Sequence, residues 1–151
     1  METKENVMFT RIALLLIVVI GALGFAGVAV GQDRVHNYFN DTALKVKATD
    51  NAAQKREILS KDLSDMTKAI DKVKSAPLTS EQDDINLDRI KATLQEKSDE
   101  LAGINGFDRV PDDQLNAFST YIVQDMEQAD TTVTISLVVL LLIIIIVILV
   151  A

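Results

Sequence analysis

Two long apolar blocks, residues 12–31 and 133–151, constrain this chain more than any other feature of its sequence. Each block is 19 or 20 residues long, and neither contains a charged residue. A helix rises about 1.5 Å per residue, so a block of this length spans the roughly 30 Å hydrocarbon core of a bilayer. The sequence therefore predicts two transmembrane helices that flank a polar segment, residues 32–132.

The charges that precede the first block predict its orientation. Lys4 and Arg11 lie in the short N-terminal tail, residues 1–11, and basic residues mark the cytoplasmic end of a span. We therefore expect an integral protein of the cell membrane with a cytoplasmic N-terminus and an extracytoplasmic helical domain. The first block is longer than the apolar core of a typical signal peptide, which favours an uncleaved signal anchor. The small residues at 29–31 leave cleavage as the alternative.

Four glycines in the first block predict a helix-packing face. They are Gly21, Gly24, Gly27 and Gly31, and spacings of three or four residues keep them near one side of a helix. Glycine lets two helix backbones approach closely, although glycine is also generally common in membrane helices. The expected partners are therefore the lipid bilayer and either other membrane protein subunits or a second copy of the chain.

The first of three amphipathic patterns in the polar segment covers residues 40–75. Its clearest part alternates steps of four and three residues, as in a coiled coil, at Leu59, Leu63, Met66, Ile70 and Val73. A less regular apolar face continues upstream through Ala43, Leu44, Ala48 and Ala52. Pro77 is expected to end the helix, because proline cannot donate the backbone hydrogen bond that a helix interior needs.

A second pattern covers residues 80–102. Its apolar seam consists of Leu87, Ile90, Leu94 and Leu101. Lys97 occupies the seam position between the last two of these leucines. Thr79 or Ser80 is a candidate N-cap, and Gly103 is a candidate C-cap.

A third pattern begins near Pro111, because proline is favoured at the first position of a helix. Its apolar stripe consists of Leu115, Phe118, Ile122 and Met126. No strand-like alternation competes with these three patterns. The sequence therefore predicts an all-α fold, with two transmembrane helices flanking an antiparallel helical hairpin or a small helical bundle.

The lengths of the helical segments favour the hairpin. A continuous helix through residue 75 matches the combined length of the two later patterns, so the chain can leave and return to one membrane face. Residues 33–75 carry nine basic and seven acidic residues, whereas residues 80–132 carry four and thirteen, which favours pairing of the two legs. The alternative is a four-helix bundle with a break near Thr49-Asp50-Asn51, where the chain has neither glycine nor proline.

The composition argues against catalysis. The chain has no cysteine and a single histidine, His36, so thiol chemistry and clusters of histidine ligands are excluded. A net charge of -7 opposes binding to nucleic acid. Acidic residues that begin the later helices are typical partners of helix dipoles rather than metal ligands. Asn40, in Asn40-Asp41-Thr42, fits a glycosylation acceptor, and no catalytic, cofactor or metal site is expected.

These features together favour a non-catalytic accessory or scaffolding subunit of a membrane protein complex. The order span, helical segment, span is also similar to the input half of bacterial and archaeal chemoreceptors and sensor kinases, without any specific motif. That similarity implies a sensor module that signals through a separate partner. A structural protein of a viral envelope is the third hypothesis, because it needs the same features.

Overall fold

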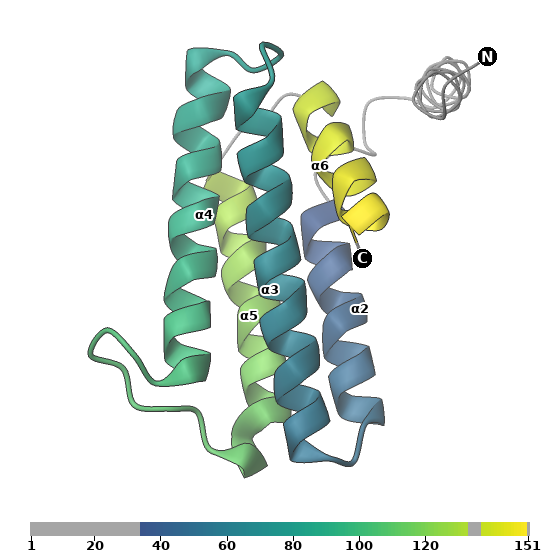
Figure 1. Ribbon diagram of the computed structural model, residues 1–151, viewed down its shortest axis with the longest axis vertical. Helices are drawn as coiled ribbons and strands as arrows, with labels where there is room; N and C mark the ends of the chain where they lie inside the picture. The colour runs from purple at the N-terminus through teal and green to yellow at the C-terminus, as the bar shows by residue number, and fades with distance from the viewer. Residues whose placement is uncertain (1–33, 133–136, 151) are drawn as a thin grey trace, which may run out of the picture. The chain divides into compact units, whose positions relative to one another are not determined.

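The computed structural model of this protein describes residues 34–132 and 137–150. The predicted tail and the predicted first span lie outside the described residues, and with them Gly21, Gly24, Gly27 and Gly31. The described helices are α2 (Arg34–Ala48), α3 (Ala52–Ser75), α4 (Glu81–Ala102), the short 3-10 helix η2 (Asp112–Gln114), α5 (Leu115–Thr132) and α6 (Leu137–Val150) (Figure 1). No strand occurs in these described ranges, and the all-α prediction is confirmed there.

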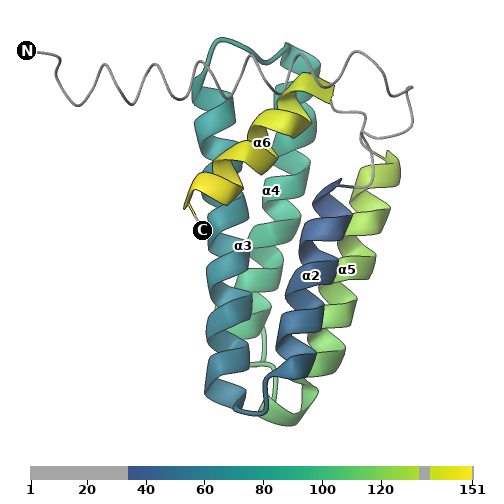
Figure 2. The same ribbon diagram turned by 90° about the vertical axis from the view of Figure 1, so that its right-hand side faces the viewer.

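Helices α2 to α5 form an antiparallel four-helix bundle around the predicted seams. Helix α3 lies along α4 (Figure 1), and α2 lies along α5 (Figure 2). The predicted seam residues of α3, α4 and α5 are all buried: Leu59, Leu63, Met66, Ile70, Val73, Leu87, Ile90, Leu94, Leu101, Leu115, Phe118, Ile122 and Met126. Apolar side chains at helical spacing therefore determine which face of each of these helices turns inward.

Local hydrogen bonds fix the ends of α4. The backbone N–H of Asp83 donates to the Ser80 hydroxyl at 3.1 Å, and the Ser80 N–H donates to Asp83 at 3.3 Å, which completes a capping box. At the other end, Gly103 adopts a left-handed conformation with φ +72°. Both predicted caps are confirmed, with Ser80 rather than Thr79 as the N-cap.

The predicted hairpin is wrong, because the first pattern breaks where the bundle alternative required. Helix α2 ends at Ala48, and Asn51 caps the new helix α3 by accepting a 3.1 Å hydrogen bond from the N–H of Gln54. An asparagine cap satisfies an N–H that has no partner within the helix, so neither glycine nor proline is needed for the break. The break lets α2 fold back along α3 and pack against α5.

The buried face of α2 also differs from the predicted one. Leu44 is 59% exposed and Ala48 is exposed, whereas the side chains that reach the core are Val35, Phe39, Ala43 and Val46. Phe39, Ala43 and Val46 repeat the steps of four and three residues found in α3. Of the residues expected on the buried face of α2, only Ala43 is therefore buried, and the rest of the core-facing side consists of other residues.

The structure contradicts the predicted integral membrane localisation. Within residues 34–132 and 137–150, no helix combines the length and apolar composition that crossing a membrane requires. The predicted second span contains α6, which has 14 residues and is about 21 Å long. Four of its side chains lie in the common core instead: Val139, Leu140, Ile143 and Val147. The predicted cytoplasmic and extracytoplasmic assignments are overturned together with the localisation.

Candidate functional site

Lys97 is the most unusual residue of the core, because its side chain is fully buried. It lies in α4 at the seam position between Leu94 and Leu101, where the helical repeat turns it towards α5. A buried ammonium group is costly unless it is paired and hydrogen-bonded. The sequence contained this signal, a single charge in an apolar seam, but did not reveal the partners.

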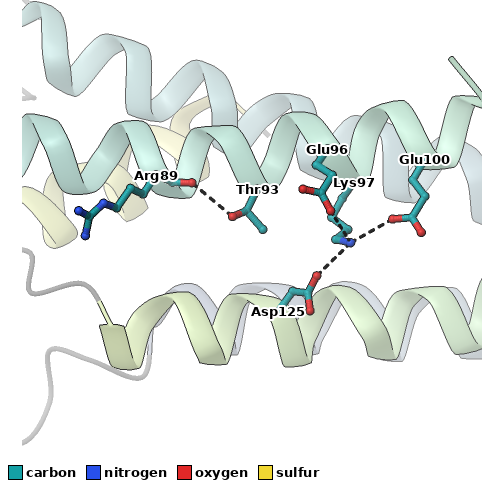
Figure 3. Close-up of polar contacts among 6 residues, drawn as sticks. All are labelled: Arg89, Thr93, Glu96, Lys97, Glu100 and Asp125. Atoms are coloured by element: carbon teal, nitrogen blue, oxygen red, sulfur yellow. Dashed lines mark hydrogen bonds and ion pairs between the residues drawn. The ribbon is translucent and has the colours of Figure 1, made fainter. Parts of the chain in front are cut away.

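Three carboxylates surround the Lys97 ammonium, as Figure 3 shows, and an aromatic ring completes its surroundings. Its Nζ lies 2.9 Å from Oδ2 of Asp125 in α5, 3.0 Å from Oε2 of Glu100 and 3.5 Å from Oε1 of Glu96. The ammonium also lies 3.9 Å from the ring centroid of Tyr121, one turn before Asp125 in α5. The cluster therefore joins α4 to α5 through a cation–π contact and an ion pair.

The surroundings of Lys97 keep it charged. Burial lowers the pKa of its ammonium, but contacts with Tyr121, Asp125 and Glu100 outweigh that effect, and the pKa is raised above its ordinary value. At neutral pH this lysine is therefore a fixed cation rather than a base or a nucleophile. Since one ammonium faces three carboxylates, the cluster keeps a surplus of negative charge when these acids are ionised.

An open depression of about 390 Å³ lies beside this cluster. Pro111, Phe118 and Tyr121 give it apolar and aromatic walls, and Glu100 and Asp108 supply acidic groups. Glu100 and Tyr121 belong both to the depression and to the Lys97 cluster. The depression is therefore lined on one side by groups that already bind a cation.

Arg56 of α3 fixes the segment that connects α4 to α5. Its guanidinium donates hydrogen bonds of 2.7 Å to the backbone carbonyls of Leu101 and Val110, and one of 2.6 Å to the Asp112 carboxylate. The hydrogen bond from Arg56 lowers the pKa of Asp112, and the charge of Arg109 adds to this effect. One side chain thus joins both ends of the connecting segment, a role that nothing in the sequence indicated.

A second polar cluster lies between α2 and α3. The Thr42 hydroxyl donates a 2.6 Å hydrogen bond to the buried carboxylate of Asp62. Asp65, also buried, accepts a 2.7 Å hydrogen bond from the Lys61 ammonium. Burial, reinforced by the negative charges of Asp62 and Asp65, raises the pKa of the Tyr38 phenol above its ordinary value. The Thr42–Asp62 hydrogen bond therefore links α2 to α3, and the Lys61–Asp65 contact satisfies a buried carboxylate within α3.

The remaining predicted site residues do not converge. Asn40 is exposed on α2, and its glycosylation stays a prediction that no structural feature tests. His36 lies in the first turn of α2. Across residues 34–132 and 137–150, no group of three or more acidic or histidine side chains is arranged to hold a metal ion.

No protein-family model, curated protein or solved structure matches this chain.

Proposed function

We propose that this protein is a non-catalytic accessory or scaffolding subunit that acts by packing an apolar helix face against another protein subunit. The observation that carries the proposal is the outward face of α6. All 14 residues of this helix are apolar, although only one side of it is buried in the core. An exposed apolar patch typically marks an interaction site.

Helical spacing separates the two faces of α6. The side chains buried against the bundle are Val139, Leu140, Ile143 and Val147. The opposite face contains Leu141, Ile145, Ile148 and Leu149, spaced so that they follow one side of the helix. Leu141 and Ile145 are half-buried, whereas Ile148 and Leu149 are 71% and 66% exposed, so the end of the stripe at Ile148 and Leu149 is the part that is most accessible to a partner.

The chemistry of the stripe favours one kind of partner. It offers no charge and no side-chain hydrogen-bond donor or acceptor, so recognition has to come from apolar burial and shape. A helix of a partner subunit with an apolar face of its own meets that requirement. The buried Lys97 cluster fits a structural role, because its charged lysine holds α4 and α5 together.

The test compares native-state complexes of two tagged full-length variants. In Ile148→Gln/Leu149→Gln the exposed end of the stripe becomes polar, while Leu44→Gln makes a matched change at a residue that is 59% exposed on α2. We expect the unaltered chain and Leu44→Gln to migrate in a complex larger than the monomer on native gels, and the double variant to migrate as the free chain. A chain that is monomeric and partner-free without any substitution would refute the proposal.

A further inference from the structure

We propose that the depression beside the Lys97 cluster docks a basic segment of a partner protein, with a lysine or arginine side chain inserted between Glu100 and Asp108. The segment would carry an apolar or aromatic residue next to that cation. This inference goes beyond the scaffolding role, because none of the residues that line the depression belongs to α6.

The Lys97 cluster supplies the electrostatic argument. Its three carboxylates, on Glu96, Glu100 and Asp125, face a single ammonium group, so one charge of the three is neutralised. Glu100 is 27% exposed and also lines the depression, where it can face a second cation. A guanidinium or ammonium group placed there would donate charge-assisted hydrogen bonds to the Glu100 carboxylate, as Lys97 already does from the other side.

The walls of the depression suit the stem of such a side chain. Lysine and arginine bury their methylene groups along apolar surfaces while the charged head stays with polar partners. Pro111, Phe118 and Tyr121 provide such a surface, and Tyr121 already contacts one cation through its ring. Arginine also stacks on aromatic rings, which makes this lining a suitable site for either side chain.

Arg109 is the one basic residue that lines the depression. Its charge helps to lower the pKa of Asp112, so it interacts with a carboxylate outside that lining. The lining therefore holds two acids, Asp108 and Glu100, against the single base Arg109, and this excess of one acid favours a basic partner. On the larger scale, residues 80–132 carry thirteen acidic and four basic residues, and this excess steers a basic partner towards the α4–α5 side of the bundle.

The connecting segment also presents apolar groups for the rest of the partner. Ile104 is 51% exposed and Phe107 is 38% exposed, and Tyr121 is 41% exposed at the depression itself. Such side chains are costly to leave in water, and their burial would add apolar contacts to the charge pairing. The partner that we expect here is therefore a peptide segment with alternating basic and apolar residues.

Fluorescence anisotropy of a labelled probe peptide with the full-length protein tests this proposal. The probe alternates lysine with leucine and phenylalanine, and a second probe has glutamate in place of every lysine. We expect the basic probe to bind, its affinity to fall as salt is raised, and the acidic probe not to bind. Equal binding of both probes, or no binding of the basic probe at millimolar protein, would overturn the proposal.

Two substitutions localise the binding. Asp108→Asn removes one charge from the depression and should weaken binding by about threefold to fivefold, whereas Asp113→Asn, an exposed acid outside the lining, should have a smaller effect. Ala117→Arg adds a positive charge to the lining of the depression and should abolish binding of the basic probe. Circular dichroism of this variant should still show an intact helical fold. Equal effects of the two aspartate substitutions, or full binding by Ala117→Arg, would refute the site. Neither result bears on the α6 face, which is tested by different variants.

Discussion

The Nζ atom of Lys97 in α4 lies 2.9 Å from Oδ2 of Asp125 in α5, inside a bundle whose other core positions are mostly apolar. Helices α4 and α5 pack against each other less extensively than α2 packs against α5 or α3 against α4. The ion pair therefore joins two helices that pack against each other less extensively than those two helix pairs do. Its removal should affect stability more than the removal of a surface pair.

The first prediction concerns Lys97→Met, which keeps a long side chain but removes the charge. Glu100 and Asp125 would lose their shared cation, and we expect the free energy of unfolding to fall by about 3 kcal/mol. Urea denaturation followed by circular dichroism measures this change. Lys91→Met is the matched control, since Lys91 pairs with Asp71 at the surface and should cost at most about 1 kcal/mol. An equal loss of unfolding free energy in the two variants would show that the buried cluster stabilises the fold no more than a surface ion pair does.

A second prediction separates two glycines of the connecting segment. Gly103 and Gly106 both have positive φ angles, +72° and +92°, so alanine is strained at either position. A Cβ at Gly103 would also lie 2.5 Å from the Cβ of Arg109, whereas one at Gly106 would meet nothing within 4 Å. Gly106→Ala should cost about 1 to 2 kcal/mol from backbone strain alone, and Gly103→Ala clearly more. Thermal unfolding of both variants gives the comparison, and equal melting temperatures would contradict it.

A third prediction concerns the break between α2 and α3. Asn51→Ala removes the side-chain acceptor for the Gln54 N–H, and we expect a loss of about 1 kcal/mol in the free energy of unfolding. Asn37→Ala, at an exposed position within α2, should have little effect. If both variants unfold at the same urea concentration as the unaltered chain, the cap does not contribute to the break.

The sequence predicted the inner faces of α3, α4 and α5 because burial of apolar residues at helical spacing is a local pattern. It did not predict the break at Asn51 as the preferred arrangement, since a continuous helix and a capped break satisfy the same local pattern. The choice depends on the packing of α2 against α5, which are far apart in the sequence. The hydrogen bonds from the Arg56 side chain to the carbonyls of Leu101 and Val110 also join positions that are distant in the sequence, so no local sequence pattern predicts them.

The apolar block at residues 133–151 shows why composition alone misled the membrane assignment. Its length and lack of charge satisfy the criterion for a transmembrane helix, but the same apolar side chains are equally suited to a protein core. In α6, Ile143 and Val147 are 1% and 2% exposed within the core. A hydropathy count does not distinguish burial in lipid from burial against α3.

A fourth prediction concerns alkaline pH. The raised pKa of Tyr38 means that the fold favours the protonated phenol, so this contribution is complete below the ordinary tyrosine pKa of about 10. As the pH rises above that value, the unfolded chain releases the proton first, and the contribution falls away. We expect the urea midpoint to drop less between pH 8 and pH 10.5 in Tyr38→Phe than in the unaltered chain. Identical drops would mean that Tyr38 does not contribute to the alkaline response.

The last prediction concerns acidic pH and the link between Arg56 and Asp112. The pKa of Asp112 is lowered in the fold, so its stabilising contribution is present above the ordinary aspartate pKa of about 3.9 and is lost as the pH falls through the lower, folded value. Below pH 3 we therefore expect the connecting segment to loosen, seen as changes in the backbone NMR signals of residues 103–111. Asp112→Asn should show these changes already at pH 6, while the hydrogen bonds from Arg56 to Leu101 and Val110 keep the segment attached. Signals of Asp112→Asn that match those of the unaltered chain at pH 6 would show that the carboxylate does not hold the segment.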